Sequence, residues 1–303
     1  MRRRKRVVLG GVMLLICTVV SSCADKGPVY FSGGLREEGL LGHVATVESI
    51  NQLAMESAEG FVKTGKVQEE SRMEFDVRGV KVLDSNGGRG GNYVMTFVPE
   101  YSEQGVLLGG EYRSGEVYLS SRKLEYDGQG RVALAVTLSP NEIAPDTLFY
   151  SYDSAGCTMS GSSSGISQTA VYTSDGCIVS RIETDNISYK TEYHYDKYGR
   201  LTEKIFYSVA DEGGTEEDVL ESETKDVVFI AEYSVTYEYD KEHRLVSEQR
   251  RNSLVKDDFD HTTTYDYELF DAAGNWLRVI KRTVYTDDSH TTNVIERTIT
   301  YHS

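Results

Sequence analysis

The chain carries six histidines, the side chains that most readily combine acid–base chemistry with metal binding. A zinc site needs three or four convergent ligands, but no two of these histidines stand at a metal-ligand spacing and no His-Glu-x-x-His motif occurs. The sequence therefore predicts no metal site and no cofactor. The histidines are His43, His194, His243, His261, His290 and His302.

Two glycine-rich stretches are candidates for catalytic or phosphate-binding loops. The stretch Gly161-Ser-Ser-Ser-Gly165 approaches the Gly-x-Ser-x-Gly nucleophile motif, but it lacks the strand-to-helix context in which that motif works. The stretch Gly87-Gly-Arg-Gly-Gly91 has neither the Lys-Ser/Thr ending nor the following helix of a phosphate-binding loop. We interpret both as flexible turns. The sequence thus assigns no catalytic residue and predicts that the protein is not an enzyme.

Two acidic runs, Asp211–Asp218 and Asp257–Asp260, offer carboxylates for calcium binding or for glycan hydrolysis. They lack the alternating order of a dedicated calcium loop, so solvated loops are the favoured interpretation. With 48 acidic residues in the chain, some close carboxylate pairs are inevitable. A carboxylate-dependent, glycan-active enzyme therefore stays open as an alternative function. It would require a deep pocket with two facing carboxyls.

Cys157 and Cys177 each follow the same glycine of a repeated motif, in consecutive copies. An exported protein can form disulfides, so this pair is a candidate bridge. Equivalent positions in neighbouring hairpins lie two strands apart, about 9.6 Å. A disulfide needs Cα atoms within about 7 Å of each other. The spacing therefore disfavours the bridge.

That motif organises the whole chain and is clearest as Tyr195-Asp-Lys-Tyr-Gly-Arg-Leu201. An aromatic residue stands four positions before each anchor glycine, and a fixed repeat indicates one structural unit stacked on itself. The anchor positions are Gly79, Gly105, Gly130, Gly156, Gly176, Gly199, His243 and Gly274. Asp follows the aromatic residue at Asp76, Asp127, Asp153, Asp196, Asp240 and Asp271.

Each copy of the motif predicts a tight β-hairpin. Asp-x-x-Gly is typical of a type I turn in which the Asp side chain accepts backbone N–H groups and the Gly takes the left-handed conformation. The residues before the turn alternate with period two, as a half-buried strand requires. One face of such a strand carries Tyr233, Val235, Tyr237 and Tyr239, and the other face is polar.

Anchor spacings of 26, 25, 26, 20, 23, 44 and 31 residues leave room for two strands and two turns per repeat, with acidic loops in the long intervals. Residues 43–54 are expected to form an opening strand, with a helix over 48–60 as the alternative. Eight hairpins imply about sixteen strands, and open sheets of more than about ten strands curl. The predicted fold class is all-β. We expect a single antiparallel meander curled into a trough or partly open barrel, with the Asp-x-x-Gly turns on one rim, the acidic loops on the other and the Tyr/Val face inside.

The unit from Tyr193 to Leu201 resembles the YD repeat of RHS-type proteins. Copies such as Asp271-Ala-Ala-Gly-Asn-Trp276 resemble, more narrowly, the YD-repeat lipoproteins of Bacteroides-like bacteria. The resemblance covers residues 43–303 and implies an array of β-hairpins without a catalytic residue. Large RHS proteins wind such hairpins into a shell around a toxin domain. This chain has too few repeats for such a shell, so no toxin-carrier role is implied.

The chain begins with basic residues 2–6, an apolar run over residues 7–20, and then Val20-Ser-Ser-Cys23. This order is typical of a secretory signal, and the run is too short for a transmembrane helix. The last four residues resemble a bacterial lipobox, in which the Cys is acylated and becomes the mature N-terminus. Because Ala24 rather than Asp follows Cys23, the outer membrane is favoured, on a side that stays open. The predicted domains are a signal peptide (1–22), a flexible tether (23–42) and the repeat domain (43–303).

The charge of the chain excludes one class of ligand. Its net charge is −16, and loss of the five basic residues of the signal peptide brings it to −21. Such a field repels a phosphate backbone, so nucleic acid is excluded as a partner.

The sequence as a whole predicts a lipoprotein anchored by palmitate on Cys23, which binds or scaffolds a glycan or protein ligand through an extended β-surface. A lipid carrier with a half-barrel trough is a further alternative. The aromatic ladder is interpreted mainly as core. If exposed, it would form a stacking platform, whose candidate residues are Tyr193, Tyr195, Tyr237, Tyr239 and Trp276.

Overall fold

The structure is a computed structural model that describes residues 35, 38–57, 62–88, 91–140, 142, 144–163, 166–174, 176–184, 188–209, 228–253 and 260–303. Within these ranges no helix has the length and apolar character needed to cross a membrane. The strands are β1 (Val44–Glu56), β2 (Val62–Phe75), β3 (Lys81–Gly88), β4 (Gly91–Tyr101), β5 (Leu107–Ser114), β6 (Val117–Tyr126), β7 (Val132–Leu138), β8 (Asp146–Tyr152), β9 (Gly156–Ser163), β10 (Ile166–Thr173), β11 (Ile178–Thr184), β12 (Ser188–Tyr195), β13 (Leu201–Val209), β14 (Phe229–Tyr239), β15 (Leu245–Asn252), β16 (His261–Phe270), β17 (Trp276–Tyr285) and β18 (His290–Tyr301).

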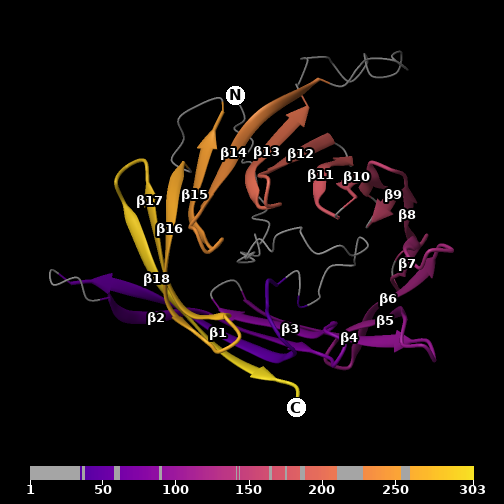
Figure 1. The fold of residues 1–303 in the computed structure, drawn as a ribbon, viewed down its shortest axis with the longest axis horizontal. Helices are drawn as coiled ribbons and strands as arrows, with labels where there is room; N and C mark the ends of the chain where they lie inside the picture. The colour runs from indigo at the N-terminus through magenta and orange to yellow at the C-terminus, as the bar shows by residue number, and fades with distance from the viewer. Residues whose placement is uncertain are drawn as a thin grey trace, which may run out of the picture.

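The eighteen described strands form a closed antiparallel barrel (Figure 1). Each strand pairs with the next along the chain, and β1 also pairs with β18 from Val44↔Tyr301 to Ala54↔Thr292. The expectation of an open trough or partly open barrel is therefore wrong, and so is the half-barrel lipid carrier that depended on it. The eight Asp-x-x-Gly-type turns all lie within the part of the meander that runs from β2 to β17. The two additional strands, β1 and β18, pair with each other and leave no free sheet edge.

The opening strand is longer than expected, and the alternative helix over residues 48–60 does not form in the described part. β1 spans Val44–Glu56. It pairs with β2 and β18 on its two sides. Paired on both sides, its backbone N–H and C=O groups are satisfied by neighbouring strands.

The eight Asp-x-x-Gly-type turns, called the anchored turns below, all lie on one rim. Each joins an even-numbered strand to the next odd-numbered one, so a meander places them together on what we call the anchored rim. In the turn between β12 and β13, Gly199 donates its N–H to the Asp196 carbonyl at 3.0 Å and has φ 74°. His243 takes φ 67° at the equivalent position. The run Asp211–Asp218 lies outside the described residues, as does the run Asp257–Asp260 except for Asp260.

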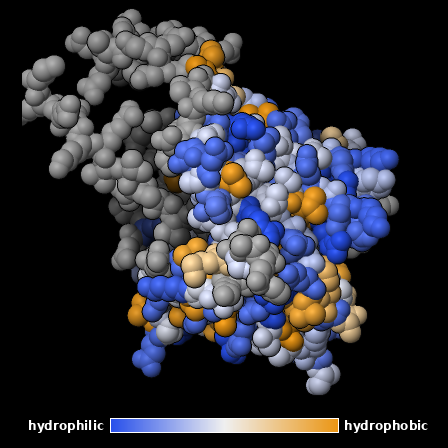
Figure 2. All heavy atoms as spheres, turned by 90° about the vertical axis from the view of Figure 1, so that its left-hand side faces the viewer, coloured by the Kyte–Doolittle hydropathy of each residue, from blue (hydrophilic) through white to orange (hydrophobic). Residues whose placement is uncertain are grey.

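The face that carries the motif aromatics is the inner face of the barrel. Leu40, in the segment before β1, packs against Val44, Val47 and Phe75, and Figure 1 shows this segment within the ring of strands. The opposite, outer face carries charged residues such as Arg72 and Glu48, together with the buried apolar pair Ile280 and Val294. Figure 2 shows that the outside of the barrel, on the side of β17 and β18, is mostly hydrophilic with scattered apolar side chains.

The inner face is less apolar than the sequence pattern predicts. It also carries the ion pair Arg181–Glu183, at 2.6 Å, and the half-buried Lys204. A barrel of this strand number encloses more width than side chains alone can fill. Charged groups are therefore tolerated inside, whereas a narrow trough would have packed them against apolar side chains.

Candidate functional site

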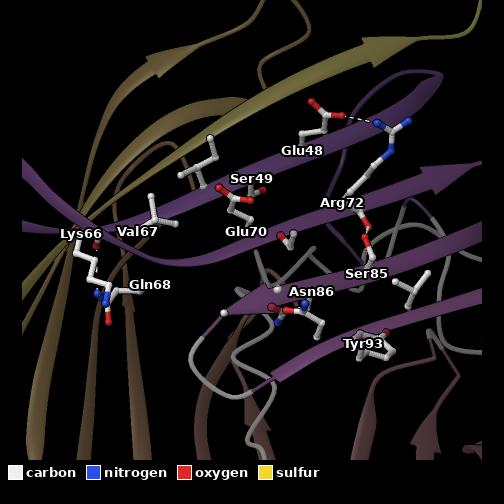
Figure 3. Close-up of a pocket in the computed structure, with 16 residues that line it drawn as sticks. Glu48, Ser49, Lys66, Val67, Gln68, Glu70, Arg72, Ser85, Asn86 and Tyr93 are labelled. Carbon is white, nitrogen blue, oxygen red and sulfur yellow. Dashed lines mark hydrogen bonds and ion pairs between the residues drawn. The ribbon is translucent and has the colours of Figure 1, made fainter.

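An open groove with a volume of about 840 Å³ crosses the outer face of β1–β4 (Figure 3). We call it the outer groove. Irregular pairing of β1 with β2 around Gln52 bends the two strands. On β3, Gly87 has no side chain, and a Cβ there would stand 3.2 Å from the Asn92 amide oxygen. The bend and the missing side chain shape the hollow.

The outer groove combines exposed apolar side chains with polar ones. Ile50, Val67 and Val94 are 40%, 37% and 44% exposed, although each belongs to a paired strand. Polar lining residues lie between them on neighbouring strands: Gln68, Ser85 and Asn92. Apolar contact area bordered by a few hydrogen-bonding groups is the usual composition of a ligand site.

Arg72 is one of the charged residues that line the outer groove, and ion pairs fix its position. Its guanidinium binds Glu48 on β1, and its Nε donates to Glu74 at 2.8 Å (Figure 3 draws the bond to Glu48). The backbone carbonyl of Arg72 accepts a hydrogen bond from the Ser85 hydroxyl at 3.3 Å. These contacts orient a cation next to the apolar residues.

The outer groove does not have the geometry of paired catalytic carboxyls. Glu48 and Glu70 both line it, but Glu48 is bound to Arg72 and the groove is open to solvent. Acid–base pairs arise where burial separates the pKa values of two carboxyls. The arrangement is suited to recognition of a ligand.

A second polar cluster lies on the inner face. Lys204 Nζ stands 5.7 Å from the centre of the Tyr193 ring, close to the ion pair of Arg181 and Glu183. Burial lowers the pKa of Lys204, and the neighbouring positive charge of Arg181 adds to this effect. The carboxylate of this cluster, Glu183, is engaged by Arg181 at 2.6 Å.

The five aromatic residues that the sequence offers as a platform lie on the inner face, partly or fully buried. Burial raises the pKa of Tyr195, of Tyr193 and of Tyr237. Trp276 is 6% exposed, packs in a core cluster with Tyr237 and Tyr239, and has the Arg297 guanidinium 3.5 Å from its ring centre. In this structure they are packing residues.

A stack of three rings that the sequence analysis missed runs along the inner face. Phe206 on β13 stacks with Tyr189 on β12 at 5.6 Å and with Tyr233 on β14 at 5.1 Å. Only the pairing register, with Phe206 opposite Tyr233, brings these rings together. Period-two spacing within each strand was visible in the sequence, but the offset between strands was not.

The remaining sequence candidates have structural positions. Cys157 is a buried free thiol and forms no bridge to Cys177. Within the described ranges, no group of three or more His, Cys, Asp or Glu side chains gathers in a way that could hold a metal ion. The anchor-turn aspartates accept backbone N–H groups, as Asp196 does from Arg200 at 3.0 Å. Cys23 lies outside the described residues.

Comparison with known proteins adds little to this geometry. No family model and no curated protein matches the chain. A solved structure of a porin-like protein from Bacteroides uniformis ATCC 8492 aligns with 85% of this chain and 96% of that chain, at 11% identity and a TM-score of 0.35. A likeness at that score carries no argument, so the barrel assignment rests on the strand pairings above.

Proposed function

We propose that the protein is a non-enzymatic, extracytoplasmic lipoprotein of the YD-repeat type, anchored to the outer membrane through Cys23. Its β-barrel would display the outer groove as a binding site for an extended glycan. The lipobox-like residues Val20-Ser-Ser-Cys23 and the basic residues before them support the anchor.

The composition of the outer face favours a tethered barrel over a membrane-spanning one. A spanning barrel needs an outward apolar band with aromatic girdles. Here, outward positions carry ion pairs such as Arg72–Glu48 and Arg113–Glu111, whose side chains are between 41% and 50% exposed. Charges at this density would oppose burial in hydrocarbon.

The observation that carries the binding proposal is the composition of the outer groove. Sugar rings present apolar C–H faces and many hydroxyls. Ile50, Val67 and Val94 offer contact to the former, and the amides of Gln68 and Asn92 offer hydrogen bonds to the latter. A closed barrel has no free edge for strand addition, which makes an added peptide strand less favourable.

The proposal is tested by calorimetric titration of the mature domain with a panel of neutral and acidic oligosaccharides. We expect binding by at least one glycan and its loss in the double variant Ile50→Asp, Arg72→Ala. The matched control is Arg113→Ala, which breaks a comparable outer ion pair outside the groove and should leave affinity unchanged. Binding of extended peptides but of no glycan would show that the groove binds peptides and that the proposed glycan ligand is wrong. Binding unaffected by the double variant would refute the groove as the site.

A further inference from the structure

The segment before β1 is fixed to the anchored rim, although the sequence assigns it to the flexible tether. Leu35 donates its N–H to the Gly79 carbonyl at 3.0 Å, in the turn between β2 and β3. Glu38 forms an ion pair of 2.8 Å with Lys81, and both side chains are largely buried. We call Leu35 together with residues 38–43 the clasp.

The other end of the clasp is held by the last anchored turn. Leu41 donates its N–H to the Asn275 side-chain oxygen at 2.7 Å, and the Asn275 amide donates to the Leu41 carbonyl at 2.9 Å. Leu40 is 7% exposed in the core beside Val47. The clasp thus joins the first and the last anchored turns across the strands at which the barrel closes.

The clasp fixes where the chain leaves the barrel. Leu35 lies twelve residues after Cys23, so the full reach between them is about 40 Å. For comparison, a random coil of twelve residues spans about 20 Å on average. The opposite rim lies about 25–35 Å from the anchored rim along tilted strands of this length.

We infer that the anchored rim faces the membrane and that the opposite rim points away from it. The inference rests on the proposed acylation of Cys23. A tether fixed at the anchored rim holds that rim close to the lipid head groups. It leaves the turns between odd- and even-numbered strands exposed on the far side, where they are free to meet other molecules.

Energy transfer from a label on one added cysteine to acceptor lipids tests the orientation in the full, acylated protein on vesicles, with Cys157 and Cys177 replaced by Ser. Lys241→Cys places a donor on the anchored rim, where the Lys241 side chain is 89% exposed. Glu116→Cys places a matched donor in the exposed turn between β5 and β6 on the opposite rim. We expect at least about twofold greater transfer at position 241, since the rims differ by about 25–35 Å. Equal transfer, or greater transfer at position 116, would overturn the orientation.

A variant with a longer tether and a check of acylation show whether the tether sets the orientation and whether the protein is anchored at all. A Gly-Ser insertion of about 24 residues after Val29 should bring the two signals together, because the average span of the tether grows with the square root of its length. An unchanged difference would show that the tether does not set the orientation. Wild-type protein that carries no acyl chain and does not sediment with vesicles would refute the proposed function as well. Acylated protein with its opposite rim nearer the lipid would refute only this inference.

Discussion

The Arg200 guanidinium lies over the ring of Tyr239, 4.8 Å from its centre, although the two residues belong to different hairpins. Arg200 follows the anchor of one turn, and Tyr239 precedes the next turn along the rim. The same relationship joins Arg131 to Tyr152 at 4.0 Å. Arg78, which precedes its anchor Gly79, makes a related contact with Tyr101 of the next hairpin at 4.2 Å. The motif therefore specifies contacts between repeats as well as the turn within each repeat.

Anchor glycines should tolerate substitution poorly, whereas turn-centre residues should not matter. Gly199→Val forces a β-branched residue to the observed φ of 74°, which should cost at least about 1–2 kcal/mol of unfolding free energy. Lys197→Ala, at the exposed turn centre, should cost less than about 0.5 kcal/mol. Urea denaturation measures both. Equal stabilities would show that the turn assignment is wrong.

The motif tyrosines should stabilise the barrel by linking hairpins. The Tyr239 hydroxyl donates to the Leu201 carbonyl at 2.9 Å, so Tyr239→Phe should lower the unfolding free energy by about 1 kcal/mol. Tyr198→Phe is the matched control, because this ring is 48% exposed at a turn centre. The control should be neutral. Two variants with the same midpoint in thermal unfolding would contradict the role assigned to Tyr239.

Asn275 should matter more than other asparagines because it holds the clasp. Asn275→Ala removes bonds to both backbone groups of Leu41 and to the Tyr301 hydroxyl. Asn275 itself is buried, so the loss of these part-buried bonds should cost about 1–3 kcal/mol. The exposed Asn92 gives the control Asn92→Ala, which should have little effect. Hydrogen exchange at residues 38–43 should accelerate only in Asn275→Ala, and protection equal to that of the wild type would disprove the clasp.

The barrel should lose stability in acid. Burial opposes the ionisation of Asp196 and Asp240, but hydrogen bonds from Arg200 and from Arg244 outweigh it, so the pKa of each carboxyl is lowered. A lowered folded-state pKa gives stability that is present above the unfolded value of about 3.9 and is lost as pH falls through the folded value. The unfolding free energy should therefore decline below about pH 4. The double variant Asp196→Asn, Asp240→Asn should show a shallower decline, and identical pH profiles would rule out these carboxyls as the cause.

Lipidation should depend on a single residue. Cys23→Ala should leave the precursor unprocessed by the lipoprotein signal peptidase, because the acylated thiol is missing, and should abolish incorporation of labelled palmitate. Cys157→Ala is the control, as that thiol is buried within the barrel. Normal palmitate labelling of Cys23→Ala would mean that another residue carries the lipid.

The sequence by itself determined the local structure of this protein. Asp-x-x-Gly fixes a turn within four residues, and period-two alternation fixes a strand, since both depend only on backbone conformation and neighbouring side chains. Consecutive strands joined by tight turns must run in opposite directions, so the sequence also placed all anchored turns on one rim. The repeat also indicated which side chains share the inner face.

Only the tertiary structure decided closure, register and the outer groove. The pairing of Val44 with Tyr301 joins residues at opposite ends of the repeat region, and no local pattern encodes a contact at that separation. Asn275 stands where three other copies carry Arg131, Arg200 and Arg244, and only the tertiary structure shows that its amide binds the docked Leu41 backbone. Likewise, Ile50 on β1 and Val94 on β4 line one groove. The pairing registers of β2 and β3, which lie between them, bring the two residues to nearly the same height along the sheet. A strand pattern fixes which face a side chain occupies, whereas its neighbours across the sheet depend on the summed registers of all the strands between them.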